Sequence, residues 1–299
     1  MPEVPSQSKT RCDVGSILGI WRLGEPIHRS PSAMHCLAQP ADAKGNPRWD
    51  YVLRQPVGPN PPVGPNPPVG PNPPVGPNPP VGPNPLEGLR QIRHFNACAA
   101  SINHPNLIVV LDASDSATHP FLVMPRLEGR TMQRCLEEGP PKALPVGLWF
   151  VRQVAQALQS MHAGGWVHGD VKPANVIVGS TGHATLIDLG FADRVHSPPN
   201  RLFRGTPEYA APENLSGESL TQPASDIFSL GRMLWQWMTK VEVASESQLS
   251  PVAELVEAMV NETPSERPTA SCISRELLRL EIESLGNHIE PKQRLRRAA

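Results

Sequence analysis

The chain has 299 residues, a net charge of -1 at pH 7 and 39% hydrophobic residues. This length allows one large or two small domains with a hydrophobic core, and the near-neutral charge argues against a general attraction to nucleic acid or to an anionic membrane. The 5 cysteines are scattered without a C-x-x-C pair, a pattern typical of reduced thiols rather than of a disulfide framework or a zinc site.

The first 15 residues are polar, and we expect them to form a disordered N-terminus. They lack the apolar core of a secretory signal. Elsewhere no apolar run approaches the roughly 20 residues that a membrane-spanning helix needs. The sequence therefore predicts a cytoplasmic protein with neither a membrane nor a nucleic acid as a partner.

Residues 16–127 are expected to form a small lobe rich in strands. Short runs of apolar and β-branched residues are bounded there by glycine, proline and polar residues, which is typical of strands. A helix is expected among them at residues 86–101. The predicted strands are IWRLGEPI (20–27), SAMHCLAQ (32–39), RWDYVLR (48–54), LIVVLD (107–112) and PFLVMP (120–125).

A proline-rich repeat interrupts this lobe between residues 56 and 85, where the unit V-G-P-N-P-P recurs. Proline restricts φ and lacks an N–H group, so we expect a disordered or extended polyproline II segment that is solvated. One interpretation is an expanded surface loop, because each doubling of loop length costs only about 0.6 kcal/mol. The alternative is a PxxP ligand for SH3-like or WW-like domains.

Residues 128–285 are expected to form a larger, mostly helical lobe. Apolar residues recur at helical spacing, and the first long helix ends at a pair of glycines, a common C-terminal signal. Residues 286–299 form a basic tail, either a solvated end or a docking segment for an acidic partner. The predicted helices are 148–165, 225–239 and 251–260, and the predicted strands are 176–178 and 184–188.

The strongest chemical signal lies in this second lobe. HGDVKPANVIV occupies residues 168–178, IDLG follows at 187–190, and GTPEYAAPE follows at 205–213. With these segments the sequence resembles the eukaryotic-like Ser/Thr protein kinases of bacteria. Their catalytic loop reads H-x-D-x-K-x-x-N, and a metal-binding D-x-G follows eighteen residues after its Asp, as here.

The resemblance covers about residues 17–285. It implies an α+β, two-lobed protein-kinase-like fold with a small β-rich N-lobe and a larger helical C-lobe. It also implies ATP and Mg²⁺ as cofactors and a protein substrate that carries Ser or Thr. Phosphoryl transfer of this kind depends on positioning and on neutralisation of charge.

The resemblance assigns the catalytic roles to a few residues. Asp170 would accept or orient the proton of the substrate hydroxyl, and Lys172 would contact the γ-phosphate. Asn175 and Asp188 would hold Mg²⁺, which prefers oxygen ligands.

Other residues of the same pattern would support the loop or the substrate. His168 would pack inside the catalytic loop, and Asp226 would anchor the backbone of that loop. Thr206 would line the site for the substrate residue. Glu213 would pair with Arg267, since arginine suits a buried bidentate pair.

One position of the loop departs from the pattern. Gly169 replaces the arginine that many kinases place before the catalytic Asp. Because that arginine receives a phosphate on the activation segment, we do not expect control by such a phosphate.

The nucleotide-holding lobe departs further. His28, Ser30 and Ala33 stand where the three glycines of the phosphate loop belong, although glycines let the backbone approach phosphates closely. Arg54 replaces the strand lysine, and its planar fork is bulkier than an ammonium group. Counting nine residues back from the His of NHPN places Phe95 where the partner glutamate belongs. We therefore expect the lysine–glutamate ion pair to be lost, with Arg54 unpaired near the nucleotide.

Adenine binding is still expected. The resemblance implies Met124 as the gatekeeper and Leu127 as the hinge residue whose N–H group binds the ring. The predicted ATP-binding residues are Ser30, Ala33, Arg54, Met124 and Leu127.

Two functions from different classes follow. The intact catalytic loop and metal residues favour a protein Ser/Thr kinase, whose activity could be weak. The losses in the N-lobe favour a catalytically impaired pseudokinase that acts as a binding scaffold. A small-molecule kinase is less consistent with GTPEYAAPE, which resembles a protein-substrate segment.

Overall fold

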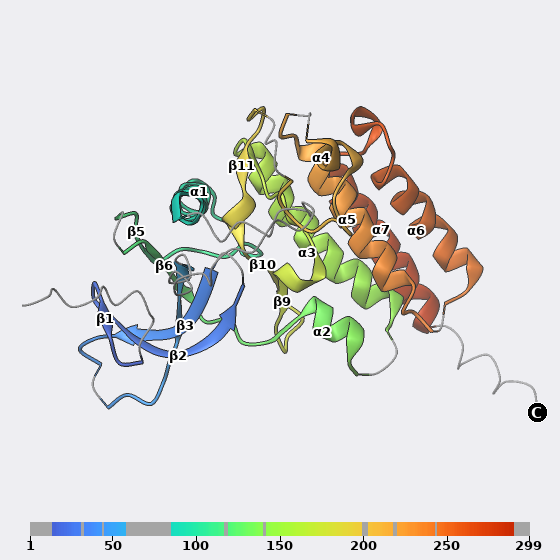
Figure 1. Cartoon of the computed structure of the whole chain (residues 1–299). Helices are drawn as coiled ribbons and strands as arrows, with labels where there is room; N and C mark the ends of the chain where they lie inside the picture. The colour runs from blue at the N-terminus through green and yellow to red at the C-terminus, as the bar shows by residue number, and fades with distance from the viewer. Residues whose placement is uncertain are drawn as a thin grey trace, which may run out of the picture. The chain divides into compact units, whose positions relative to one another are not determined.

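The computed structural model divides the chain into two compact units (Figure 1). Unit 1 comprises Met1–Asn96 and Val110–Arg126, and unit 2 comprises Ala97–Val109 and Leu127–Ala299. The sequence predicted a single division, after residue 127. The residues that the structure describes are 14–30, 33–43, 45–57, 85–116, 119–139, 142–198, 203–217, 220–242 and 244–289.

Unit 1 contains a six-stranded antiparallel sheet in the order β1-β2-β3-β4-β6-β5 (Figure 1). The expected strands near residues 20–27, 32–39, 48–54 and 120–125 are confirmed, with shifts at their ends. The strands are β1 (Ile17–Leu18), β2 (Trp21–Arg29), β3 (Ala33–Pro40), β4 (Tyr51–Pro56), β5 (Asp112–Ser114) and β6 (Phe121–Pro125).

The strand predicted at residues 107–112 is wrong over most of its length. Strand β5 begins only at Asp112, and Leu107 forms an isolated bridge to Leu186. Leu107 and Ile108 are buried, and the N–H of Ile108 donates to the carbonyl of Leu186. The apolar run is divided because its first half serves the core of unit 2, whereas its end enters the sheet of unit 1.

The core of unit 1 lies on one face of its sheet. Trp21 Nε1 donates to Asp112 Oδ2 at 2.6 Å, which joins β2 to β5 although three strands separate them in the sheet order. This contact requires a sheet that curls on itself, as twisted sheets do. The buried core residues are Trp21, Leu23, Ala38, Leu53, Phe121 and Val123.

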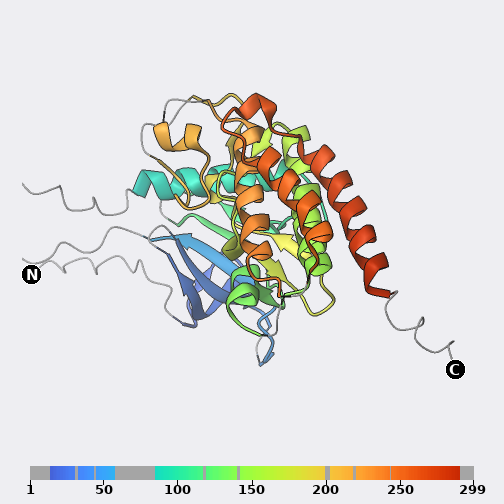
Figure 2. The same ribbon diagram turned by 90° about the vertical axis from the view of Figure 1, so that its right-hand side faces the viewer.

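Helix α1 (Pro85–Ser101) follows the proline-rich repeat and confirms the helix expected at residues 86–101 (Figure 2). Gly88 of α1 packs directly on Pro56 at the end of β4, and a side chain at Gly88 would collide with Pro56. The two ends of the repeat therefore lie next to each other in unit 1. The lead at residues 1–13, most of the repeat (58–84) and the end of the tail (290–299) lie outside the described residues.

Unit 2 is mostly helical. Helix α3 packs against both α5 and α7 (Figure 2). The helices are α2 (Met132–Glu137), α3 (Leu144–Ala163), α4 (Pro212–Ser216), α5 (Pro223–Met238), α6 (Glu246–Met259) and α7 (Ala270–Ile289). The strands are β7 (Arg130–Thr131), β8 (Trp166–Val167), β9 (Val176–Val178), β10 (Ala184–Leu186) and β11 (Asp193–Arg194), and the 3₁₀ turns are η1 (Pro173–Asn175), η2 (Leu189–Phe191) and η3 (Pro264–Glu266).

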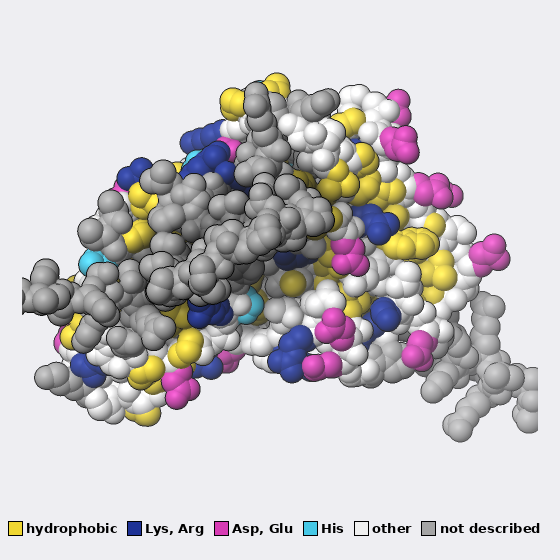
Figure 3. All heavy atoms as spheres, viewed as in Figure 1, with side chains coloured by type: hydrophobic (Ala, Val, Ile, Leu, Met, Phe, Trp, Pro, Cys, Tyr) yellow, Lys and Arg dark blue, Asp and Glu magenta, His cyan; other side chains and the backbone are white. Residues whose placement is uncertain are grey.

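The three long helices predicted in this region are confirmed, but each begins earlier than expected. Helix α6 starts at Glu246 because Ser245 and Gln248 form a capping box that supplies hydrogen bonds to the first turn. Within the described ranges, none of the helices has both the length and the apolar composition required to cross a bilayer. On the face shown in Figure 3, acidic and basic side chains are interspersed over the described surface.

Candidate active site

One buried carboxylate binds the backbone at the start of the catalytic-loop motif of unit 2. Asp226 lies in the first turn of α5 and is 1% exposed. Its Oδ2 accepts the N–H of His168 at 2.8 Å, and its Oδ1 accepts the N–H of Gly169 at 2.9 Å. Since two successive backbone N–H groups are bound by one side chain, the start of the loop has little freedom to move.

A residue that the sequence analysis did not single out completes this anchor. His162, in the last turn of α3, places Nε2 2.9 Å from Asp226 Oδ2. Burial acts to raise the pKa of Asp226, but hydrogen bonds and charge from His162 and His168 outweigh it and hold that pKa below its ordinary value. Asp226 is therefore a carboxylate, and only the packing of α3 against α5 reveals the role of His162.

His168 is fully buried inside the loop that it begins. Its Nε2 lies 3.1 Å from the carbonyl of Ile187, and its Nδ1 accepts the N–H of Asp170 at 3.2 Å. One ring thus connects the catalytic loop to the segment that carries Asp188. This arrangement fixes the ring between two parts of the predicted site.

Asp170 lies at the centre of a hydrogen-bond network. Its Oδ2 is 2.7 Å from Lys172 Nζ, and its Oδ1 accepts the hydroxyl of Thr206 at 2.8 Å. Lys172 Nζ also donates to Thr206 Oγ1 at 2.6 Å, which closes a triangle of three side chains. Thus the structure brings the hydroxyl of Thr206, from a distant motif, to the carboxylate and the ammonium of the catalytic loop.

Thr206 reaches Asp170 because its neighbour is a glycine. Gly205 has φ of +110°, a conformation that other residues rarely adopt. A Cβ at this position would lie 3.0 Å from the carbonyl oxygen of Gly169 and 3.5 Å from Asp170 Oδ1. The glycine therefore permits the close approach of the two segments.

The backbone conformation also explains why residue 169 is a glycine. Its φ is +79°, and a Cβ there would lie 2.8 Å from the carbonyl oxygen of Phe191. An arginine at this position would need a different backbone. The backbone of the loop therefore favours glycine over arginine at this position.

Asn175 and Asp188, the two predicted metal ligands, lie on neighbouring segments. Asn175 Nδ2 donates to both the carbonyl oxygen and Oδ2 of Asp170, at 2.9 and 3.0 Å, so its Oδ1 is the atom that could bind a cation. The carbonyl of Asn175 accepts the N–H of Ile187, the residue before Asp188, at 2.8 Å. Asp188 has φ of 62°, and its Oδ1 accepts the N–H of Gly190 at 3.2 Å. An amide oxygen and a carboxylate fit a hard cation such as Mg²⁺.

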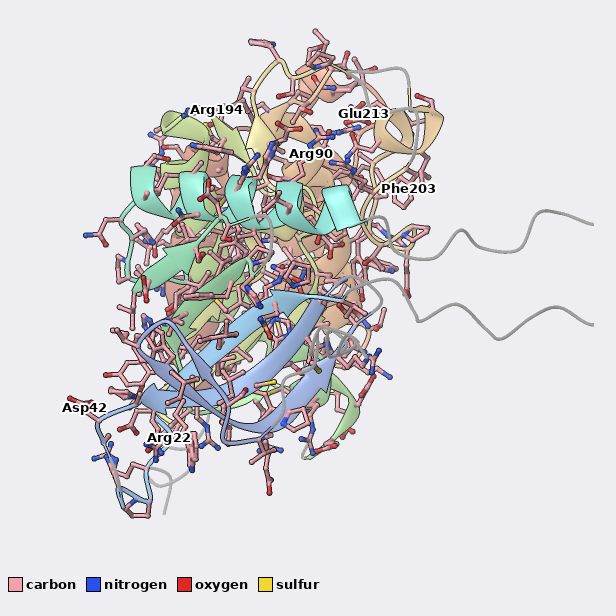
Figure 4. The ribbon with its side chains drawn as sticks, turned by 60° about the vertical axis from the view of Figure 1, so that its left-hand side comes forward. Arg22, Asp42, Arg90, Arg194, Phe203 and Glu213 are labelled. Atoms are coloured by element: carbon pink, nitrogen blue, oxygen red, sulfur yellow. The ribbon has the colours of Figure 1, made fainter. Side chains whose placement is uncertain are left out.

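The chain segment after Asp188 is tied back to β8. Strand β11 pairs with β8, and the guanidinium of Arg194 lies 4.2 Å from the centre of the Trp166 ring (Figure 4). Such a cation–π contact contributes about 0.5–1 kcal/mol at an exposed site. Ser197 Oγ donates to Asp193 Oδ1 at 2.7 Å. These contacts hold the start of this segment against β8.

Glu213 and Arg267 form a buried bidentate pair (Figure 4 labels Glu213). Arg267 Nη1 and Nη2 donate to the two oxygens of Glu213 at 2.7 and 2.9 Å. Arg267 also donates to the carbonyls of Asn261 and Ala224. Burial acts to raise the pKa of Glu213, but the hydrogen bonds from Arg267 and Ser225 together with the charge of Arg267 lower it overall. The pair joins the end of GTPEYAAPE to η3.

In unit 1, Arg54 of β4 is 3% exposed and contacts α1. Its Nη2 donates to Gln91 Oε1 at 3.5 Å, and its guanidinium lies 5.4 Å from the centre of the Phe95 ring. The expectation that Arg54 is unpaired is therefore wrong. The sequence count identified Phe95 but missed Gln91, which lies one turn earlier on the same face of the helix. Counting residues from a motif cannot identify Gln91 as the partner, because this contact depends on how α1 packs on the sheet.

The other predicted nucleotide residues lie in β3, in β6 and just after β2 and β6. Met124 of β6 pairs with Val52, two residues from Arg54, so alternation along the strands puts Met124 and Arg54 on one face of the sheet. Ser30 and Ala33 close the β2–β3 hairpin. Leu127 follows β6 and is the first residue of unit 2 after the division.

Comparison with known proteins gives a consistent result. The family model described as "Protein kinase domain" matches residues 88–295 and leaves strands β1 to β4 outside the match. The chain is 31% identical over 217 residues to the serine/threonine-protein kinase PkaA of Streptomyces coelicolor, a match that covers 64% of this chain and 40% of the relative.

Two mycobacterial proteins are also similar over shorter stretches. The serine/threonine-protein kinase PknB of Mycobacterium leprae is 31% identical over 149 residues, 47% of this chain and 24% of that protein. The serine/threonine-protein kinase PknA of Mycobacterium tuberculosis is 33% identical over 153 residues, 48% of this chain and 35% of that protein. The chain thus spans less than half the length of these relatives.

Proposed function

We propose that this chain, which belongs to the protein kinase family, transfers the γ-phosphate of Mg·ATP to Ser or Thr of a protein substrate. The match confirms two predictions made from the sequence, the bacterial-type kinase family and the two-lobed α+β fold with a β-rich N-lobe and a helical C-lobe. These three relatives are named serine/threonine-protein kinases, which favours the enzyme over the pseudokinase scaffold.

The observation that carries the proposal is the contact between Asp170 and a hydroxyl. Thr206 donates its O–H to Asp170 Oδ1 at 2.8 Å, so this carboxylate is placed to bind a hydroxyl as hydrogen-bond acceptor. A substrate Ser or Thr hydroxyl would bind to the same carboxylate, which would orient it and take its proton. A positioned base of this kind typically contributes 10²- to 10⁴-fold to a rate.

The neighbouring residues would manage the phosphate charge. Lys172, 2.7 Å from Asp170, would neutralise charge on the γ-phosphate as it transfers. Asn175 Oδ1 and Asp188 would hold Mg²⁺, which neutralises and positions the phosphates when bound. Met124 and Leu127 would contact adenine, and Thr206 would face the substrate residue.

The proposal extends to partners only in part. The family supports a protein that carries Ser or Thr as the substrate. An SH3-like or WW-like partner of the repeat stays a prediction, because the repeat lies outside the described residues. Cytoplasmic location is likewise a prediction.

The test is a calorimetric titration of Mg·ATP into the full chain, followed by transfer of labelled phosphate to a library of Ser and Thr peptides. We expect binding that requires both Mg²⁺ and Asp188, with loss of binding in Asp188→Ala. We expect Asp170→Asn to keep ATP binding and to lose transfer.

Asp42→Asn is the matched control, because Asp42 is an exposed carboxyl in the turn after β3 (Figure 4). It should behave like the parent chain in both assays. If millimolar Mg·ATP does not bind, or if the parent chain transfers no phosphate, the kinase proposal is wrong. If transfer is undiminished in Asp170→Asn, the role of Asp170 as the base is wrong. The first outcome would point to the scaffold.

A further inference from the structure

Three basic side chains form a row across neighbouring strands of unit 1. His28 of β2 lies directly opposite His35 of β3, and His35 lies directly opposite Arg54 of β4. Residues that are directly opposite in a sheet point to the same face. The two imidazole rings are in fact adjacent, with centroids 5.6 Å apart. The row is exposed at His28, half-buried at His35 and buried at Arg54.

The inner end of the row is held in place by α1. Gln91 and Phe95 contact the guanidinium of Arg54, and both are buried. These contacts fix the direction of the arginine along the sheet face. The row therefore leads from solvent at His28 to an oriented guanidinium at its inner end.

The hairpin that joins β2 and β3 uses its own backbone groups. The N–H of Ser30 donates to the carbonyl of Ala33 at 2.8 Å, and the N–H of Ala33 donates to Ser30 Oγ at 3.0 Å. These two N–H groups are thus engaged in closing the turn. Among the described residues around the hairpin, side chains are therefore better placed than these N–H groups to bind a phosphate.

The same sheet face becomes apolar next to the row. Leu37 is opposite Val52, and Val52 is opposite Met124. Leu37 and Val52 each lie two residues along the strand from a member of the basic row, a spacing of about 7 Å. Met124 lies two residues from Leu122, which is opposite Arg54. A ligand that is anionic at one end and flat and apolar at the other fits this pair of rows.

We propose that His28 and His35, backed by Arg54, bind the phosphate oxygens of a nucleoside triphosphate by side-chain hydrogen bonds, in place of a backbone cradle. This proposal rests on the proposed function, and it states which side chains bind the phosphates of the ATP used in that reaction. Imidazole N–H groups donate to phosphate oxygens, and a guanidinium donates to two of them at once. No covalent step is involved.

The experiment compares ATP with adenosine, which lacks the phosphates. Both are titrated into the full chain and into the double variant His28→Leu, His35→Leu. We expect the double variant to bind ATP about tenfold or more weakly, because hydrogen bonds to the phosphate charge are lost, while adenosine binding changes less than about twofold. The ratio of the two affinities separates phosphate contact from damage to the fold, which would weaken both.

Two further variants sharpen the test. His119→Leu is the matched control, since His119 is an exposed histidine of the same unit that lies outside the row, and it should leave the ratio unchanged. His35→Gln keeps an N–H donor and should recover part of the ATP affinity.

If the double variant loses equal affinity for ATP and for adenosine, or loses none, the ratio of the two affinities stays unchanged. That result would overturn the role of the two histidines in phosphate binding, while the kinase function would stand. Absence of ATP binding in the parent chain would overturn both proposals.

Discussion

The two units hold their functional residues in different ways. In unit 2, Asp226, Asp170 and Glu213 each accept at least two hydrogen bonds at 3.2 Å or less. Each of the three also lies within 3 Å of a basic side chain, which is His162, Lys172 or Arg267. In unit 1, Arg54 meets a neutral amide at 3.5 Å and an aromatic ring. The groups proposed for phosphoryl transfer and those proposed to hold the nucleotide therefore depend on different contacts. The residues of unit 2 can keep the family pattern while those of unit 1 depart from it.

The energetic consequence is also unequal. A carboxylate at 1% exposure, such as Asp226, would cost several kcal/mol without its partners, so each partner is strongly coupled to folding. A long hydrogen bond to a neutral amide is coupled weakly. We therefore expect substitutions in unit 2 to change stability, and substitutions around Arg54 to change affinity.

The largest effect should follow Asp226→Asn. The amide cannot accept both backbone N–H groups and also face His162, so unfolding should become easier by about 3–5 kcal/mol. Urea denaturation measures this change. The exposed Asp42→Asn should stay within about 0.5 kcal/mol. Equal midpoints for the two variants would contradict the role of Asp226 as the anchor.

Next in size is the loss of the buried arginine in Arg267→Met, which we expect to cost about 3 kcal/mol because Glu213 is left without its charge partner. The chain offers a matched surface pair, since Arg279 of α7 contacts Glu276 and Glu283 at half exposure. Arg279→Met should cost less than about 1 kcal/mol. A surface variant as damaging as the buried one would show that burial does not decide the strength of these pairs.

The same pair predicts a pH dependence. The pKa of Glu213 in the folded chain is below its ordinary value of 4.5, so the unfolded chain binds more protons near that pH. The stabilisation is fully present above 4.5 and is lost as the pH falls through the folded pKa. The free energy of unfolding between pH 6 and pH 3 should therefore drop less for Glu213→Gln than for the parent chain. Parallel curves would show that this carboxyl does not contribute.

Arg54 should give a smaller effect that appears in affinity. Arg54→Ala should weaken ATP binding by about tenfold, and Arg54→Lys should weaken it less because a positive charge remains. Gln91→Ala should act in the same direction, since the arginine loses one of the contacts that orient it. Calorimetric titration of Mg·ATP measures all three. An affinity unchanged in both Arg54 variants would remove this residue from the nucleotide site.

The smallest effect should follow removal of the repeat. Pro56 and Gly88 are already in contact, so a four-residue Gly-Ser linker in place of residues 58–84 should leave the melting temperature and ATP binding nearly unchanged. Replacing Gly88 by Ala in the full chain should lower the melting temperature, because the new methyl group meets Pro56. A large loss on removing the repeat would mean that it packs on the folded chain.

Much of this molecule could be predicted from short-range sequence. The catalytic loop, the D-L-G segment and GTPEYAAPE are runs whose spacing along the chain already carries their chemistry. The long helices could be predicted because each packs one face on the core. Apolar residues therefore recur at helical spacing along the sequence. The repeat could be recognised from composition alone.

Other features were decided only when distant segments met. The partner of Arg54 is Gln91 because of where α1 lies on the sheet, and His162 reaches Asp226 because α3 packs on α5. The apolar run at residues 107–112 is divided between the core of unit 2 and the sheet of unit 1, which no periodicity could reveal. The row of His28, His35 and Arg54 exists only through strand register. Sequence by itself determined which groups are present and their local conformation, because these depend on neighbours in the chain. Tertiary structure decided which groups meet, because hydrogen bonds and ion pairs act over a few ångströms in space, whatever the separation in sequence.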